Sequence, residues 1–168
     1  EGAKLKTVSI GHLPELKEDI EKLQRQGLLD KHLAESYLQF NYDVTAGLPG
    51  AKSILIVTIP QQLTRTVFNW QGKMYRCDIP PTYIGKADNA HVKDALTAIV
   101  GPDGFKVMRV HLPVKTLAVR SGLAQYGRNN ITYVLGYGSY HQLAAFATDC
   151  ECQEDNWGII GFPDIGGR

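Results

Sequence analysis

Residues 48–60 have the sequence LPGAKSILIVTIP, and this stretch decides the class of fold. Leu48-Pro49-Gly50 is typical of a turn, and Pro60 ends the β-branched, largely apolar run Ser53–Ile59 that follows it. A strand that is apolar at successive positions, and not only at alternate ones, is buried on both faces. We therefore expect this run to be a central strand of a sheet that helices cover.

The rest of the chain supplies neighbours for this strand. Apolar spacing and turn residues predict strands at 5–10, 105–112, 130–135 and 140–148, a hairpin over 65–79 that turns at Gln71-Gly72, and helices at 15–27, from Asp30, at 88–100 and at 114–122. The predicted fold is α+β, with a central mixed sheet that includes antiparallel hairpins and is flanked by helices.

Composition narrows the class of protein. The chain has 168 residues, a formal charge of +1 and 43% hydrophobic residues, which corresponds to one globular domain. This charge gives no electrostatic basis for binding nucleic acid or an anionic membrane, and the apolar runs are too short to span a bilayer. Three cysteines make no disulfide framework and favour a reducing compartment. We expect a soluble, cytoplasmic protein.

The densest unusual segment is SGLAQYGRNNI, residues 121–131. Two glycines, an arginine and two asparagines between a helix and a strand would present backbone N–H groups and amide side chains to a polar ligand. The same residues also suit a helix C-cap at Gly122 followed by a left-handed turn, and glycine-rich turns are common. The segment has no phosphate-binding fingerprint.

Cysteine and histidine offer two further candidates for chemistry. Cys150 and Cys152 form a Cys-Glu-Cys pair, and only the addition of Cys77 and His141 would complete a four-ligand metal site. The ligand count favours free thiols. His111 ends a predicted strand and is either an acid or base that titrates near neutrality or a structural histidine.

One part of the chain resembles a known family. The stretch LAVRSGLAQYGRNNITYVLGYGSYHQLAAFATD, residues 117–149, resembles the epoxyqueuosine reductases in its Gly-Leu helix end, Gly-rich turn, Gly-Ser pair and Thr-Asp strand end. Leu48–Ile54 is similar to the PGAKSI segment that precedes the central strand of that family. The resemblance covers residues 48–149.

This resemblance implies a nitroreductase-like, cobalamin-binding domain of a fold that reductive dehalogenases share. It implies that the Gly-rich loop and neighbouring strands hold the corrin with its base off the cobalt. Carried over by position, the cofactor-binding residues are Tyr126, Gly127, Arg128, Asn129, Asn130, Gly138 and Ser139. In the family, two 4Fe-4S clusters in a ferredoxin-like module that follows directly supply the electrons.

The chain departs from the family pattern in its cysteines. The family supplies its cluster cysteines in CxxCxxC runs, whereas this chain has only Cys150 and Cys152, too few for even one Cys₄ cluster. We therefore expect a cobalamin-binding-like domain over 1–150 and a tail over 151–168, with the 4Fe-4S clusters supplied by a ferredoxin module or a partner. The chain is then a corrinoid-binding domain that is inactive alone.

A second departure concerns the proton donor. Reductases of epoxyqueuosine carry an acidic residue in a segment shortly before the Gly-Leu helix, whereas Val110–Pro113 has no carboxylate. His111 is the residue that could replace it as the catalytic proton donor. This difference puts the reduction of epoxyqueuosine itself in doubt, although not the wider family.

Two rival functions use the same fold. One is a non-catalytic module that docks a partner or forms a homodimer through a sheet edge or an apolar patch. The other is a flavin-binding relative of the nitroreductases, because a shared fold does not select the cofactor.

Overall fold

The computed structural model describes residues 2–83 and 89–158. Its core is a four-stranded sheet in the order β1-β2-β8-β5, made of β1 (Lys4–Ser9), β2 (Ser53–Pro60), β8 (His141–Thr148) and β5 (Val107–Arg109). The α+β class is confirmed, but the sheet is not mixed: β1 with β2, β2 with β8 and β5 with β8 all pair antiparallel. In the central pair, for example, β8 begins opposite Pro60, where β2 ends.

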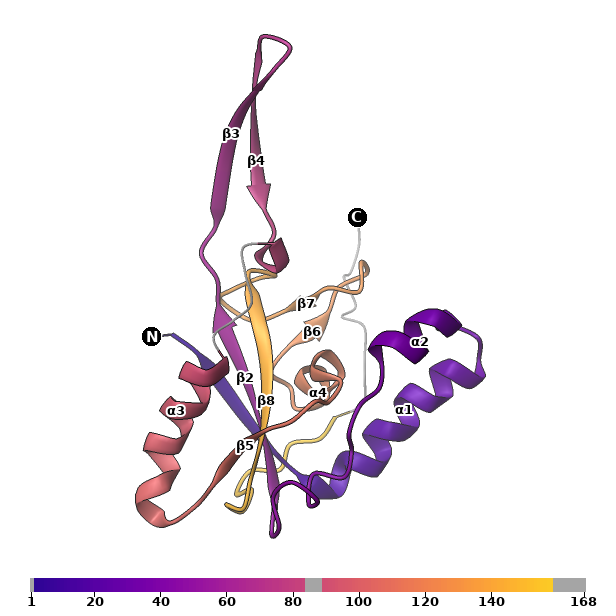
Figure 1. Ribbon diagram of the computed structural model, residues 1–168, viewed down its shortest axis with the longest axis vertical. Helices are drawn as coiled ribbons and strands as arrows, with labels where there is room; N and C mark the ends of the chain where they lie inside the picture. The colour runs from indigo at the N-terminus through magenta and orange to yellow at the C-terminus, as the bar shows by residue number, and fades with distance from the viewer. Residues whose placement is uncertain (1, 84–88, 159–168) are drawn as a thin grey trace.

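Strand β2 is central and buried on both faces, as its apolar run predicted. Ile54 and Ile56 face one core with α1 (Leu13–Arg25) and α4 (Val114–Arg120). Leu55 and Val57 face a second core with Phe146 and with Leu96 of α3 (Asn89–Val100). Helix α3 therefore covers one side of the sheet, and α1 and α4 cover the other (Figure 1). The predicted first residue of α3, Asp88, lies outside the described residues.

Short helical segments connect these elements. The 3-10 turns are η1 (Ile10–His12), η2 (Pro81–Tyr83) and η3 (Gly101–Asp103), and the second α-helix is α2 (Lys31–Tyr37). Helix α1 ends before Gly27, whose φ of +66° confirms its predicted role as the stop. No helix within residues 2–83 and 89–158 combines the length and the apolar character needed to cross a membrane.

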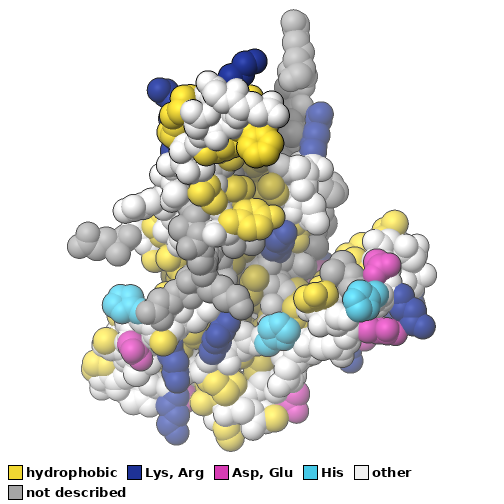
Figure 2. Space-filling model, turned by 45° about the horizontal axis from the view of Figure 1, so that its top comes forward, with side chains coloured by type: hydrophobic (Ala, Val, Ile, Leu, Met, Phe, Trp, Pro, Cys, Tyr) yellow, Lys and Arg dark blue, Asp and Glu magenta, His cyan; other side chains and the backbone are white. Residues whose placement is uncertain are grey.

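The predicted hairpin is present but stands apart from the main sheet. Strands β3 (Thr64–Trp70) and β4 (Lys73–Ile79) pair only with each other and project from one end of the sheet (Figure 1). Gln71 and Gly72 both have positive φ, as a tight two-residue hairpin turn requires. Figure 2 shows hydrophobic and basic side chains together at this projecting end.

The last third differs from the predicted pair of long strands. The segment predicted at 130–135 is reduced to β7 (Thr132–Tyr133), which pairs with β6 (Gln125–Tyr126) and not with β8. The strand predicted at 105–112 is likewise shortened to β5. Strand β7 is short because a tight turn follows it, in which Val134 N donates to Gly138 O at 2.9 Å. This turn redirects the chain before β8 begins.

The described end of the chain is held against the N-terminal half. The indole of Trp157 stacks on the His12 ring at 4.5 Å and donates to Glu15 at 2.8 Å. Arg120, which is buried, donates to the backbone carbonyl of Gly158 at 2.8 Å. Residues 159–168 of the predicted tail lie outside the described residues.

Candidate ligand site at the first turn of α4

His111 lies just before α4 with one ring nitrogen engaged. Its Nδ1 is 3.0 Å from the carbonyl oxygen of Gln39, and its ring lies 5.3 Å from that of Phe40. A carbonyl only accepts hydrogen bonds, so Nδ1 carries a hydrogen and the neutral ring presents Nε2 as an acceptor. This side chain is exposed, and its orientation is fixed by Gln39 and Phe40. Nε2 is then the ring nitrogen left to meet solvent or a ligand.

The Gly-rich segment forms a self-contained turn between β6 and β7. Gly127 N donates to Ile131 O at 2.8 Å, Asn130 N donates to Gly127 O at 3.1 Å, and Ile131 N donates to the Asn129 side-chain oxygen at 3.2 Å. Asn130 has the left-handed φ of +57° that asparagine tolerates. These three backbone amides are therefore used within the turn and are not free for a ligand.

This turn folds back onto the first turn of α4. The ammonium of Lys115 donates to Asn130 O at 3.3 Å, and the hydroxyl of Tyr126 lies 3.5 Å from that of Thr116. Burial raises the pKa of Tyr126, so its hydroxyl stays protonated at neutral pH. His111 precedes α4 by three residues, but its ring contacts Gln39 and Phe40 and not the turn 126–130.

Gly138 and Ser139 stand at the start of β8. Gly138 has φ +58°, and no atom of the described chain lies within 4 Å of the position that a Cβ would take. Its carbonyl accepts from Nδ1 of His141 at 3.1 Å, which leaves Nε2 of His141 to accept from the Thr132 hydroxyl at 3.1 Å. The sequence offered His141 only as a metal ligand, whereas the structure shows that it ties the Gly138 turn to β7.

Burial lowers the pKa of His141, so it is neutral at pH 7. Both of its nitrogens have partners in the fold, which removes it from the four-ligand site considered from the sequence. Cys77 lies on the projecting hairpin, while Cys150 and Cys152 follow β8, and all three are free thiols. Within residues 2–83 and 89–158, no three histidine, cysteine or acidic side chains gather as a metal site would need.

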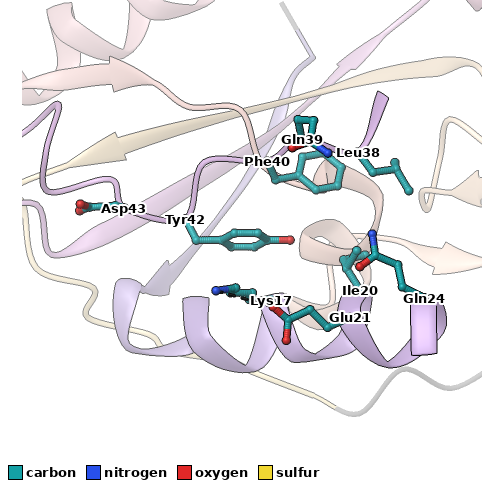
Figure 3. A pocket seen from close by; sticks show the side chains of 9 residues that line it. All are labelled: Lys17, Ile20, Glu21, Gln24, Leu38, Gln39, Phe40, Tyr42 and Asp43. Carbon is teal, nitrogen blue, oxygen red and sulfur yellow. Dashed lines mark ion pairs between the residues drawn. The ribbon is translucent and has the colours of Figure 1, made fainter. Parts of the chain in front are cut away.

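A hollow of 390 Å³, lined in part by Gln39 and Phe40, was not anticipated from the sequence. It separates α1 from the segment Leu38–Asp43, and Figure 3 shows the phenol of Tyr42 crossing it beneath the ring of Phe40. A second hollow of 440 Å³ lies against β1 and is lined by Leu123 and Leu135. Neither hollow is lined by residues 126–130, 138 or 139. The only signal for the first hollow was the aromatic pair in Phe40-Asn41-Tyr42.

Similar proteins are found only when the fold of this chain is compared with solved structures. No family model and no curated protein matches the sequence. The fold matches epoxyqueuosine reductase from Streptococcus thermophilus with a TM-score of 0.62 at 17% identity, over 96% of this chain and 46% of that one. The chain has the fold of about half of an epoxyqueuosine reductase.

Two further epoxyqueuosine reductase structures agree. One, solved with an epoxyqueuosine-modified tRNA-Tyr stem loop, gives a TM-score of 0.64 at 18% identity over 98% of this chain and 45% of that one. The other, from Bacillus subtilis, gives 0.60 at 17% identity over 98% and 45%. The predicted resemblance is thus confirmed as a shared fold. The roles of His111, of residues 126–130 and of Gly138-Ser139 stay predictions.

Proposed function

We propose that this chain is the corrinoid-binding domain of an epoxyqueuosine reductase-like oxidoreductase. The observation that supports the proposal is the contact of the turn 126–130 with the first turn of α4, through Lys115 and Tyr126, within the epoxyqueuosine reductase fold. Fold alone does not select a cofactor, so the proposal depends on this geometry and on the sequence motif at the turn.

The residues at this end of α4 suit a large planar cofactor. The open space over Gly138 lets a ligand approach the backbone, and the exposed side chains of Arg128 and Asn129 offer hydrogen-bond donors. Tyr126, Gly127, Asn130 and Ser139 complete the group that would hold the corrin. When bound, cobalamin supplies the reducing cobalt centre, and the protein supplies positioning and exclusion of water.

His111 would hold the proton for such a reduction. Its Nδ1 is held by Gln39 O, so a proton is exchanged at Nε2, on the exposed side of the ring. The three cysteines of the chain are fewer than the ligands of one Cys₄ cluster. The electrons would therefore come from a ferredoxin-like module or partner, and the chain alone would be inactive.

Titration of the purified chain with cob(II)alamin, followed by absorbance and electron paramagnetic resonance, tests this proposal. We expect conversion to the base-off spectrum. Arg128→Gln should weaken binding about tenfold through the loss of a charged donor. Arg76→Gln, which removes the same charge from the hairpin, should not. No spectral change with cofactor in large excess, or an equal effect of both variants, refutes corrin binding at this turn.

A second candidate, a partner-binding module, is favoured by the hairpin. Phe68, Trp70 and Tyr75 lie on one face of β3–β4 and are 48%, 62% and 42% exposed, and the rings of Phe68 and Tyr75 stack at 5.5 Å. Exposed aromatic groups of this kind are common at interaction sites. Light scattering during size-exclusion chromatography tests for a homodimer. A dimer that Trp70→Ser converts to a monomer supports this candidate, and a monomer at all concentrations excludes self-association.

A further inference from the structure

The β3–β4 hairpin leaves the outer edge of β4 unpaired. In the part of the chain that the structure describes, its two strands pair only with each other, and β4 is exposed from Lys73 to Asp78. Trp70 and Lys73 flank the two-residue turn, so they form a hydrogen-bonded pair, and such pairs alternate along the ladder. The backbone N–H and C=O groups of Met74, Arg76 and Asp78 therefore point outward, away from β3. An open edge of this kind accepts another strand.

The charges of the hairpin favour an acidic partner. Its cations are Arg65, Lys73 and Arg76, and its one acid, Asp78, pairs with Arg65. Among the ion pairs of the described chain, none includes Lys73 or Arg76. Both of these residues lie on β4, one on each face of the hairpin. The β4 edge therefore presents positive charge on both of its faces.

A second copy of this chain and a nucleic acid fit this edge less well. Two β4 edges placed together would bring Lys73 and Arg76 close to the same cations of the other copy, which is destabilising. Nucleic acid binding depends on many phosphate contacts, whereas this edge offers two cations. A nucleic acid also lacks the alternating N–H and C=O groups with which an open strand pairs. The edge therefore matches an extended, acidic polypeptide.

We propose that the β4 edge binds an extended acidic segment of a partner protein as a third strand of the hairpin. In an antiparallel arrangement, carboxylates of this segment lie opposite Lys73 and Arg76, and apolar side chains lie opposite Met74 and Tyr75. Met74 is 67% exposed and Tyr75 is 42% exposed, so both have apolar surface to bury. This inference rests on the partner-binding candidate above and names its partner. It does not depend on corrin binding, which the cob(II)alamin titration tests separately.

A capped hexapeptide of sequence TTEVVE is the probe, because in antiparallel register its two glutamates face Arg76 and Lys73. Two-dimensional NMR on the isotope-labelled full chain measures binding from the backbone amide shifts. We expect shifts along β4, and at least tenfold weaker binding of the charge-reversed peptide TTKVVK. N-methylation of the second valine, opposite Met74, removes a ladder hydrogen bond and should abolish binding. N-methylation of the first valine, whose N–H points away from β4, is the control and should not.

Charge reversal in the chain gives an independent test. Arg76→Glu should weaken TTEVVE about tenfold and strengthen TTKVVK, a swap of preference that loss of folding cannot produce. Lys31→Glu makes the same change in net charge at an exposed site on α2, and should alter neither affinity. Equal binding of the two peptides, or no shift in β4 at millimolar peptide, overturns the proposal. Tighter binding of an oligothymidylate than of TTEVVE overturns it in favour of a nucleic acid, and dimerisation that TTEVVE does not reverse overturns it in favour of a second copy.

Discussion

The turn beside α4 requires a residue without a side chain at position 127. A Cβ at this position would lie 2.5 Å from Cε2 of Tyr133 and 2.9 Å from Oδ1 of Asn129. Both neighbours are held, because Asn129 accepts from Ile131 N and its amide donates to the Tyr133 hydroxyl at 3.3 Å. The packing of the turn therefore already accounts for this glycine, independently of any ligand.

Gly127→Ala should destabilise the protein by about 1–3 kcal/mol, because Tyr133 and Asn129 must move. Gly101→Ala is the matched control, since its new Cβ would meet only Thr97 Cγ2 at an ordinary 3.8 Å. That control should change stability by less than about 0.5 kcal/mol. Urea denaturation measures both, and equal stability of the two variants would contradict the crowding seen at Gly127.

His141 makes stability depend on pH. Its pKa in the folded protein lies below the ordinary value of about 6.5, because burial disfavours the charged ring. The unfolded chain therefore binds the proton more readily, and the free energy of unfolding falls as pH drops through about 6.5. His141→Gln keeps a donor and an acceptor but does not titrate, so this part of the decline should disappear.

Denaturation at pH 7.5 and pH 5.5 measures the effect of this substitution. His32→Gln, at an exposed position on α2, should keep the pH dependence of the wild type. If His141→Gln keeps it as well, the decline arises elsewhere and His141 is not the titrating group.

At the scale of elements, the β3–β4 hairpin is the least integrated part of the fold. Residues 65–78 are all exposed, and the two strands share no ladder with the four-stranded sheet. Arg65 and Asp78 pair across the strands at 2.5 Å, but an exposed pair contributes little to stability. The stability of the domain is therefore expected to come from the two cores around β2.

Replacing residues 65–78 with a short Gly-Ser linker should leave the melting temperature within about 3 °C of the wild type. Ile56→Ala, in the fully buried centre of β2, should instead cost about 2–5 kcal/mol. Circular dichroism on heating compares the two. A deletion as damaging as Ile56→Ala would show that the hairpin is part of the cooperative core.

At the scale of the whole molecule, Arg120 connects three distant parts of the chain. Its guanidinium pairs with Asp19 at 2.8 Å and Glu15 at 3.0 Å, both on α1. It also donates to Gly158 O and lies 5.5 Å from the ring centre of Trp157. One buried cation on α4 thus holds the N-terminal helix and the described end of the chain together.

Arg120→Ala should destabilise the protein by about 3–5 kcal/mol, because Asp19 would remain partly buried without its partner. Arg25→Ala removes an arginine of α1 whose pairs with Glu18 and Glu21 are exposed, and should cost less than about 1 kcal/mol. Urea denaturation compares them. Similar costs would mean that the Arg120 cluster is no stronger than a surface pair.

Local chemistry determined much of this protein from sequence alone. Three features were predictable: the buried strand at Ser53–Ile59, the helix stop at Gly27 and the turn at Gln71-Gly72. Burial on two faces selects apolar residues at successive positions, and a positive φ selects glycine. The sequence motif around Gly127 likewise pointed to the fold that structural comparison confirms. Each of these signals depends on residues close together in the chain.

Only the tertiary structure decided the remaining features. The antiparallel sheet and the Arg120 cluster join residues so far apart that no spacing records their contact, and the nearer pairing of β6 with β7 and the His141 bridge have no period that would announce them. The hollow at Tyr42 is of the same kind, because α1 and Leu38–Asp43 form it only when packed together. Which groups contact one another, how the strands align and which side chains are buried are properties of the folded chain. The chemistry of a site depends on all three.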